Sequence, residues 1–229
     1  MGAVVIVGAS RGLGLAFAKG LIKETDRAWL VSKNRPPVCD DERILWVEAD
    51  LSAPGPALSA ALSGIACDRI DALVYNASTW EDRDFDEMAV DELISILNIS
   101  LVSAVQIVRE LEEPIRRGAG NLVFIGSTCG LENEGAASVA YAGAKFGLRG
   151  VSSALREHLR KAGVRVTCLN PGSMATDLDY GDPEGALAKY GGRRIPVDDV
   201  VSLVRCILSL SPAACVKELD LPATTDTDV

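Results

Sequence analysis

A tyrosine and a lysine lie four positions apart in the sequence Tyr141-Ala142-Gly143-Ala144-Lys145. In an α-helix this spacing places both side chains on one face. A phenol with a pKa of about 10 is a weak acid or base at neutral pH, and a neighbouring ammonium would lower that pKa. The pair could therefore move a proton, although the same spacing also occurs in amphipathic helices that bury one aromatic ring.

A glycine-rich turn lies near the start of the chain. The apolar run 3–7 leads into Gly8-Ala9-Ser10-Arg11-Gly12-Leu13-Gly14, and a helical pattern follows. Glycines between a strand and a helix let a pyrophosphate approach the backbone N–H groups of the helix N-terminus. The alternative is a plain turn with glycines for close packing, but its place on the first strand-helix unit favours a dinucleotide. The predicted contacts are Gly8, Ser10, Arg11, Gly12, Leu13 and Gly14.

The charges after the second apolar run predict which dinucleotide binds. An acid there would accept hydrogen bonds from the adenosine ribose and repel a 2′-phosphate. Residues 30–35 contain no acid, and Ser32, Lys33 and Asn34 together with Arg11 offer cations and a hydroxyl that suit a phosphate monoester. This favours NADP(H). Solvated loop charges and an NAD-linked enzyme remain the alternative.

Short apolar runs alternate with longer amphipathic stretches along the whole chain. Strands are expected at 3–7, 28–32, 44–48, 72–75, 121–125, 164–169 and 216–221. Helices are expected at 13–22, 86–116, 138–162 and 197–210. Continuous apolar runs that are each followed by a helix indicate a parallel sheet covered on both faces.

We therefore predict an α/β fold, a doubly wound parallel sheet of about seven strands with helices on both faces, as in the Rossmann fold. A TIM barrel is the competing fold, but it needs eight strand-helix units. Residues 1–229 are expected to form a single dinucleotide-binding and catalytic domain. The glycine- and charge-rich stretch 177–196 is predicted to be a short substrate lid.

The composition argues against several classes of function. Lys and Arg number 23 against 32 for Asp and Glu, so a net charge of −9 disfavours nucleic acid and anionic membrane surfaces as partners. No apolar run is expected to be long enough to cross a bilayer, and no basic leader precedes Gly2, so a cytoplasmic location is predicted. The six cysteines lack metal-ligand spacing and His158 is the only histidine, so no metal site is predicted.

Taken together, these motifs resemble the short-chain dehydrogenase/reductase family over nearly the whole chain. The matching pieces, in order, are 8–14, Asp50-Leu51, 71–77, Asn98, 127–130, 141–145, Asn170-Pro171-Gly172 and Thr176. Each piece is weak alone, and their joint order and spacing carry the resemblance.

The resemblance implies a role for each catalytic position. Tyr141 would protonate the substrate carbonyl oxygen, and Ser127 would donate a second hydrogen bond to that oxygen. Lys145 would hold the nicotinamide ribose and lower the pKa of the tyrosine. Asn98 would hold a water that links Lys145 to solvent. The alternative is that Asn98 is simply an exposed polar residue of a helix.

The resemblance also implies a cofactor groove, in which Asp50 would lie near the adenine amino group, although Asp50 could equally be a helix cap. The groove residues are Asp50, Leu51, Asn76, Ala77, Tyr141, Lys145, Pro171, Gly172 and Thr176. The sequence departs from the family pattern at Val7, at Ser78, where a glycine is expected, and at its C-terminal end.

The expected function is an NADPH-dependent carbonyl reductase acting on a small ketone, diketone or aldehyde. The Ser-Arg form of the glycine turn and the short C-terminus are similar to the sepiapterin- and benzil-reductase-like branch. The family implies a homodimer or homotetramer through the helices expected at 86–116 and 138–162. The alternatives are a non-catalytic dinucleotide-binding regulator on the same fold and an NAD-linked alcohol dehydrogenase.

Overall fold

The computed structural model describes residues 2–80, 83–131 and 138–225. One sheet of seven parallel strands has the order β3-β2-β1-β4-β5-β6-β7. This confirms the predicted doubly wound fold, in which the strand order reverses between β1 and β4. The strands are β1 (Ala3–Val7), β2 (Arg27–Ser32), β3 (Ile44–Glu48), β4 (Ala72–Tyr75), β5 (Asn121–Ile125), β6 (Arg165–Pro171) and β7 (Glu218–Leu221).

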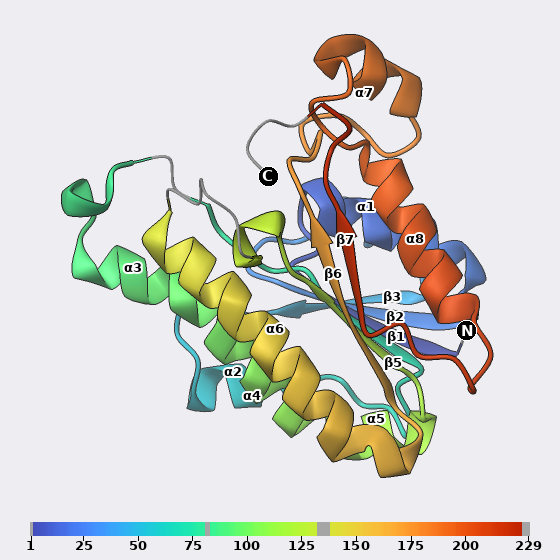
Figure 1. Ribbon diagram of the computed structural model, residues 1–229. Helices are drawn as coiled ribbons and strands as arrows, with labels where there is room; N and C mark the ends of the chain where they lie inside the picture. The colour runs from blue at the N-terminus through green and yellow to red at the C-terminus, as the bar shows by residue number, and fades with distance from the viewer. Residues whose placement is uncertain (1, 81–82, 132–137, 226–229) are drawn as a thin grey trace.

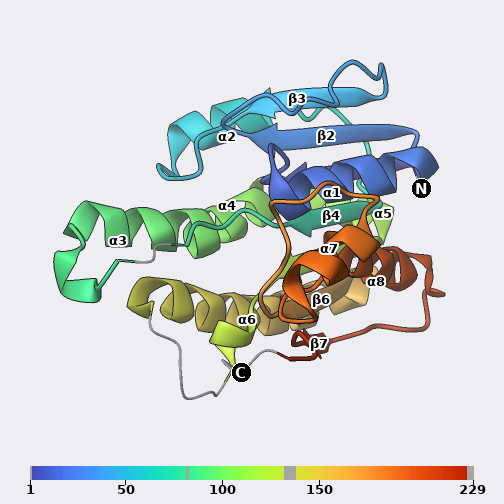
Figure 2. The same ribbon diagram turned by 90° about the horizontal axis from the view of Figure 1, so that it is seen from above.

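Helices cover both faces of the sheet (Figures 1 and 2). One face carries α1 (Gly12–Leu21) and α8 (Val197–Ser209), and the other carries α2 (Pro56–Leu62), α4 (Ser103–Glu110) and α6 (Val139–Leu159). The remaining helices are α3 (Val90–Leu97), α5 (Glu112–Gly118) and α7 (Pro183–Tyr190). Short 3-10 turns are η1 (Ile22–Glu24), η2 (Phe85–Glu87), η4 (Thr128–Gly130) and η5 (Arg160–Ala162), and η3 (Asn98–Val102) is a π-helical turn.

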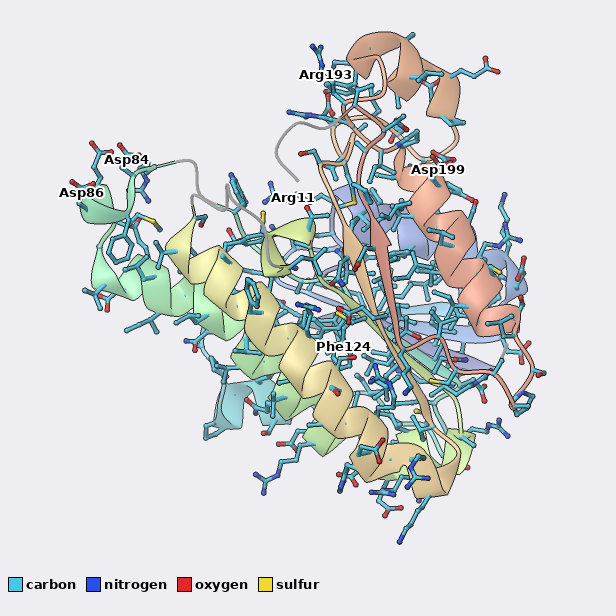
Figure 3. All side chains as sticks on the ribbon, viewed as in Figure 1. Arg11, Asp84, Asp86, Phe124, Arg193 and Asp199 are labelled. Atoms are coloured by element: carbon cyan, nitrogen blue, oxygen red, sulfur yellow. The ribbon has the colours of Figure 1, made fainter. Side chains whose placement is uncertain are left out.

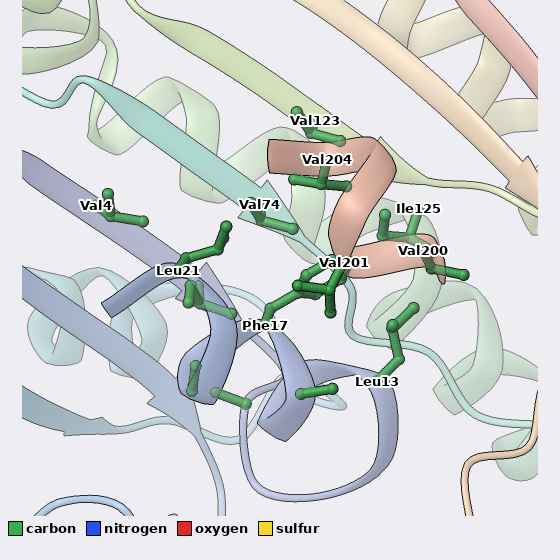
Figure 4. Close-up of a cluster of buried hydrophobic side chains, with 14 of the residues drawn as sticks. Val4, Leu13, Phe17, Leu21, Val74, Val123, Ile125, Val200, Val201 and Val204 are labelled. Carbon is green, nitrogen blue, oxygen red and sulfur yellow. The ribbon is translucent and has the colours of Figure 1, made fainter. Parts of the chain in front are cut away.

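The central strands β1, β4 and β5 are almost wholly buried because both of their faces are covered. Successive side chains of β1 point to opposite faces, so Val4 and Ile6 join one hydrophobic cluster and Val5 and Val7 the other. Figure 4 shows the first cluster, where strand residues pack against two helices: Val4, Val74, Val123 and Ile125 against Leu13, Phe17 and Leu21 of α1 and Val200, Val201 and Val204 of α8.

The prediction of a single long helix at 86–116 is wrong. The structure divides it into α3, the π turn η3, α4 and α5. At the π turn the backbone N–H of Ser103 donates to the carbonyl oxygen of Asn98, five residues earlier. The hydroxyl of Ser103 and the amide of Asn98 also donate, over 2.8 Å each, to the carbonyl oxygens of Leu51 and Ser52. Apolar periodicity does not reveal such an inserted residue, which often marks a functional site.

Within the described residues, one helical stretch, Val90–Glu110, is long and apolar enough to cross a membrane by length and composition. The sequence expectation that no run reaches that length is therefore wrong, because α3, η3 and α4 continue one another. Buried helices of soluble proteins also pass this test, yet only 28% of the most apolar window is buried here. Its exposed apolar side chains include Ile94, Leu97, Val102 and Val105.

The 177–196 segment is anchored at its base and contains α7. Met174 and Ile195 form a β-bridge, and the backbone N–H of Ala175 donates to the carbonyl of Ile195 over 2.9 Å. The carboxylate of Asp177 accepts hydrogen bonds from Lys189 over 2.6 Å and from the hydroxyl of Tyr190 over 2.7 Å. Figure 1 shows α7 beyond the carboxyl end of β6, on the side where the site lies.

Candidate active site

The predicted site residues gather where strands β1, β4, β5 and β6 end. Carboxyl ends of parallel strands meet at one edge of a sheet, and ligands of doubly wound folds bind where the strand order reverses. The turn after β1 is glycine-rich, Asn76 follows β4, and Ser127 comes two residues after β5. In Figure 3, Arg11 lies at the end of the sheet that faces the 177–196 segment, which carries Arg193, whereas Phe124 lies within the sheet.

Ser127 and Tyr141 are brought together by different elements. Ser127 caps the 3-10 turn η4, and its oxygen accepts the backbone N–H of Cys129 over 3.2 Å. Tyr141 lies in the first turn of α6, and Ser127 is close enough to its phenol to act on the pKa of that group and lower it. Ser127 is buried, and Tyr141 is half-buried. Two hydroxyl groups therefore meet at one point, as hydrogen-bonding to a substrate carbonyl oxygen requires.

Lys145 follows Tyr141 by one helical turn but does not touch its hydroxyl in this structure. The ammonium lies over the tyrosine ring, 5.2 Å from the centroid, and donates to the carbonyl of Ile125 over 2.8 Å. Burial lowers the pKa of Lys145 to about 8, and the nearby thiols of Cys168 and Cys129 partly oppose this change. The charge of this lysine is thus sensitive to pH just above neutrality.

The predicted lowering of the tyrosine pKa is not what the structure gives. Burial raises the pKa of Tyr141 above its ordinary value, and the hydrogen bonds of Ser127 and Ser78 only partly oppose that rise. Lys145 does not reverse the rise, because its ammonium lies over the ring and donates to a backbone oxygen. At neutral pH the phenol is protonated, which is the form that can donate a proton.

Asn98 braces a neighbouring loop. Its amide donates to the carbonyl oxygen of Ser52 over 2.8 Å, while Ser103 on the same helical stretch holds Leu51. Asn98 and Ser103 thus fix the end of the segment that carries Asp50. The ammonium of Lys145 is committed to Ile125, so a relay between Lys145 and Asn98 would have to pass through water, as the resemblance implies.

The glycine turn forms a cradle that side chains would fill. Gly8 and Gly12 have φ values of +82° and +52°, which favour glycine. A Cβ on Gly8 would lie 2.6 Å from the Cα of Ala77, and one on Gly14 would lie 1.9 Å from the carbonyl oxygen of Gly8. Helix α1 starts at Gly12 and has no acid in its first turn. The exposed backbone at this helix N-terminus fits the pyrophosphate of a dinucleotide.

One of the two cationic side chains predicted to bind a 2′-phosphate already has an acidic partner in the structure. Arg11 and Lys33 are both exposed, but the ammonium of Lys33 forms an ion pair of 2.7 Å with Asp50. The hydroxyl of Ser32 is buried and donates to the carbonyl of Asn34 over 2.8 Å. Hydrogen bonding to Lys33 holds the pKa of Asp50 at about 2. Asp50 therefore competes with any phosphate for the ammonium of Lys33.

The remaining groove residues line the same edge of the sheet. The amide of Asn76 donates to the carbonyl of Gly8 over 3.2 Å, which ties the loop after β4 to the glycine turn. Thr176 lies above Gly12, where an added Cβ would be 3.3 Å from the threonine Cβ. Pro171 ends β6, and the backbone N–H of Gly172 donates to Leu221 over 2.9 Å. The predicted cofactor positions around Gly12 and Asn76 thus form one continuous surface.

Three neighbours of the proposed catalytic pair, Ser127 and Tyr141, could not be assigned from the sequence. Ser78 was noted only as a departure, yet it is near enough to the phenol of Tyr141 to oppose the rise in its pKa. The ring of Trp80 meets the Tyr141 ring edge-on, with centroids 4.9 Å apart. Arg149 donates over 2.8 Å to the carbonyl of Gly130 and so supports the turn η4 that follows Ser127. The serine at position 78, where the family pattern expects glycine, was the only feature of the sequence that could have pointed to this neighbour of Tyr141.

One cavity of the described residues does not belong to this site. It measures about 880 Å³ and lies at the opposite, amino edge of the sheet, among Gly2, Asp71 and Arg165. A smaller cavity of about 150 Å³ lies between α1 and the start of the 177–196 segment, and Gly12 and Thr176 line it. A catalytic site requires several polar side chains that converge on one point, and these lie at the carboxyl edge. We therefore place the site there, although its cavity is smaller.

Comparison with known proteins identifies the family. The family model for short chain dehydrogenases matches residues 2–185, and the chain belongs to this family of oxidoreductases. Oxidoreductase BOA17 of Botryotinia fuckeliana is 26% identical over 75% of this chain and 65% of its own length. Carbonyl reductase family member 4 of Xenopus laevis is 28% identical over 80% of each chain.

Solved structures show the same fold. An alcohol dehydrogenase of Thermococcus sibiricus in complex with 5-hydroxy-NADP is 20% identical, has a TM-score of 0.81 and aligns over 98% of this chain and 97% of its own. A 3-oxoacyl-[acyl-carrier protein] reductase of Brucella melitensis with bound NAD is 22% identical, with a TM-score of 0.80, over 96% and 89%. Family and fold together support a nicotinamide dinucleotide as the cofactor of this oxidoreductase.

Proposed function

We propose that the protein is an NADPH-dependent carbonyl reductase in which Tyr141 is the proton donor. The observation that carries the proposal is that Ser127 and Tyr141, from two different elements, lie beside one another at the carboxyl edge next to the glycine turn. Two hydroxyls that meet at one point can hold a carbonyl oxygen and protonate it. A regulator that only binds a dinucleotide has no need of this pair.

Each residue then has a defined task. Ser127 donates a hydrogen bond to the carbonyl oxygen and holds it against Tyr141. Tyr141, whose phenol is protonated at neutral pH, gives its proton to that oxygen as charge develops there. Bound NADPH would supply the hydride to the carbonyl carbon. Lys145 keeps a positive charge near the phenol and would hold a ribose hydroxyl of the bound cofactor.

The preference for NADPH over NADH is part of the proposal. Arg11 and Lys33 are exposed cations beside the groove, and residues 30–35 carry no acid. Among solved structures of this fold, one holds 5-hydroxy-NADP and another holds NAD. The ion pair of Lys33 with Asp50 favours the second candidate, an NAD-linked dehydrogenase, because it occupies the cation that a 2′-phosphate would need.

A small carbonyl compound is the proposed substrate. The short 177–196 segment would act as its lid. The Ser-Arg form of the glycine turn is similar to the sepiapterin- and benzil-reductase-like branch, whose members reduce side-chain ketones or vicinal diketones. The exposed ring of Trp80 beside Tyr141 supports a planar or aromatic ketone. A cytoplasmic location accompanies this proposal.

A homodimer or homotetramer is proposed for the assembly. The exposed apolar side chains of α3, η3 and α4, together with Phe146 of α6, would be covered by a second copy. Sedimentation of the wild-type protein and of Phe146→Glu tests this assembly. A wild-type monomer at micromolar concentration would contradict it.

Activity assays decide between the candidate functions. The purified protein is mixed with NADPH or NADH and a panel of ketones, vicinal diketones and aldehydes, and nicotinamide absorbance is followed. Faster oxidation of NADPH on a carbonyl substrate supports the proposal. Activity with NADH alone supports the NAD-linked dehydrogenase, and binding of either dinucleotide without turnover on any carbonyl or alcohol supports the regulator.

A further inference from the structure

One carboxylate closes the 177–196 segment on itself. Asp177 accepts two hydrogen bonds at Oδ2, from the ammonium of Lys189 over 2.6 Å and from the hydroxyl of Tyr190 over 2.7 Å. Both donors lie in the last turn of α7. The guanidinium of Arg194 lies over the Tyr190 ring, 4.6 Å from its centroid, and Nη1 of Arg194 is 4.0 Å from Oδ1 of Asp177. We call these four residues the Asp177 clamp.

The clamp begins next to a residue that reaches the glycine turn. The backbone before it is fixed, because the N–H of Ala175 donates to the carbonyl of Ile195 over 2.9 Å. Thr176 is the next residue, and it lies over Gly12, where an added Cβ would be 3.3 Å from the threonine Cβ. Asp177 follows Thr176 directly. The clamp therefore determines the direction in which the chain leaves Thr176, and so how this residue is presented to the groove.

The sheet order places Thr176 at the nicotinamide half of a bound dinucleotide. Such a ligand lies across the carboxyl edge where the strand order reverses. Lys33 and Asp50, the residues proposed to contact the adenosine, follow β2 and β3 on one side of the reversal. Thr176 follows β6 on the other side, as Ser127 follows β5. The nicotinamide half therefore lies on the side of Thr176 and of the proposed proton donor.

We propose that Asp177 is a positioning residue that fixes Thr176 against the nicotinamide half of the bound dinucleotide. The inference rests on the proposed function, which supplies the cofactor groove. The carboxylate of Asp177 is occupied by Lys189 and Tyr190 of its own segment, so it acts on the cofactor through Thr176. When the clamp is broken, the adenosine side of the groove keeps its geometry, and the loss of affinity is confined to the nicotinamide half.

The exposure of the clamp separates positioning from stability. The side chains of Asp177, Lys189 and Arg194 are each about half exposed. Ion pairs of this kind add little to the unfolding free energy. Hydrogen bonds from Lys189 and Tyr190 hold the pKa of Asp177 at about 2, so the carboxylate is charged at neutral pH. Removing it should therefore leave the midpoint of urea unfolding nearly unchanged.

The test compares two ligands that differ by the nicotinamide half. Calorimetry measures the affinities of NADP⁺ and of adenosine 2′,5′-bisphosphate, or of NAD⁺ and AMP if the protein prefers NAD⁺. Asp177→Ala is expected to weaken the dinucleotide by about two- to tenfold, the factor of one hydrogen bond, and to leave the nucleotide unchanged. Asp177→Asn keeps an acceptor oxygen and should lose less. An equal loss for both ligands, or no loss for either, would overturn the inference.

Asp179→Ala is the matched control for charge. Asp179 lines the same small cavity as Thr176 and pairs with Lys19 over 3.4 Å, so this variant removes a negative charge without touching the clamp. It is expected to leave the ratio of the two affinities unchanged. A change in that ratio as large as in Asp177→Ala would assign the effect to charge and contradict the positioning role.

Two further variants test the route of the effect. Lys189→Met combined with Tyr190→Phe breaks the clamp from its other side and should reproduce Asp177→Ala. Thr176→Val should weaken the dinucleotide alone, and adding Asp177→Ala to it should cause little further loss, because both changes act on the same contact. Fully additive losses would show that Asp177 does not act through Thr176.

Binding decides this inference separately from the proposed function. A protein that turns over no carbonyl contradicts the proposed function, while the ratio of affinities still decides the role of Asp177. Turnover of carbonyls together with a wild-type ratio in Asp177→Ala would overturn the inference and leave the proposed function standing. A protein that binds neither the dinucleotide nor the nucleotide would overturn both.

Discussion

The ammonium of Lys33 lies 2.7 Å from the carboxylate of Asp50, so two residues proposed to contact opposite parts of one adenosine are joined directly. Lys33 follows β2, and Asp50 follows β3. Both side chains are largely exposed, so their pairing adds little to the stability of the fold. Its consequence lies in recognition, because a 2′-phosphate at Lys33 would have to share the ammonium with a carboxylate whose pKa is about 2.

Asp50→Asn is expected to increase the preference for NADPH over NADH. The amide keeps an oxygen that can accept a hydrogen bond, removes the negative charge and releases Lys33 for the phosphate. Titration of intrinsic fluorescence with each dinucleotide should show NADPH binding several-fold more tightly and NADH binding little changed. Lys33→Ala should do the reverse and weaken NADPH selectively. Equal loss of both dinucleotides in Lys33→Ala would remove the phosphate assignment.

Tyr141→Phe is expected to reduce kcat by roughly 10²- to 10⁴-fold, the usual contribution of a general acid. The affinity for NADPH should stay nearly unchanged, because the ring and its packing against Trp80 are kept. Stopped-flow measurement of hydride transfer separates chemistry from cofactor release. Ser127→Ala provides the companion variant and should lower kcat by a smaller factor. Near-normal kcat in Tyr141→Phe would show that another group donates the proton.

Lys145 links the stability of the protein to pH. Burial lowers its pKa from 10.5 in the unfolded chain to about 8 in the folded protein. Between these two values the unfolded chain binds more protons, so this residue makes the free energy of unfolding rise as pH increases from about 8 toward 10.5. The full contribution is roughly 3 kcal/mol, at 1.36 kcal/mol for each pKa unit.

Lys145→Met isolates that contribution, because the other titrating groups are the same in both proteins. Urea unfolding at a series of pH values should show the stability of the wild type rising relative to that of Lys145→Met above pH 8. A difference between the two proteins that stays constant with pH would mean that Lys145 keeps an ordinary pKa when folded.

The doubly wound parallel sheet and the motifs of the candidate site could be predicted because both depend on local signals. Apolar runs marked each strand, and parallel pairing brings Gly8 and Ser127 to one edge without knowledge of any side-chain contact. The π turn at Asn98 could not be predicted, since one inserted residue leaves the apolar periodicity almost unchanged. Hydrogen bonds made by Asn98 and Ser103 to a distant loop determine it.

Contacts between side chains of different elements could not be predicted from the sequence either. Lys33 and Asp50 are separated by 17 residues. The sequence gives a plausible role to each residue alone, and their pairing changes that role. The pKa of Tyr141 is the clearest example, because the spacing to Lys145 predicted a lowered value while burial, which the motif does not report, raises it.

Two glycine substitutions should have opposite effects on stability. Gly14→Ala places a Cβ 1.9 Å from the carbonyl oxygen of Gly8 and 2.8 Å from the amide nitrogen of Asn76. These groups are fixed by the sheet and by their own hydrogen bond, so the turn must move. The expected loss is about 2 kcal/mol of unfolding free energy, together with most of the affinity for the dinucleotide.

Gly143→Ala is the matched control, since residue 143 also lies in a helix but is exposed and has no atom within 4 Å of an added Cβ. Replacing a helical glycine by alanine there should raise the unfolding free energy by roughly 0.5–1 kcal/mol. Urea denaturation of both variants, with dinucleotide titration of each, measures the contrast. If Gly14→Ala proved as stable as the wild type and bound the dinucleotide normally, the close approach of α1 to the end of β1 would not be required for the cradle.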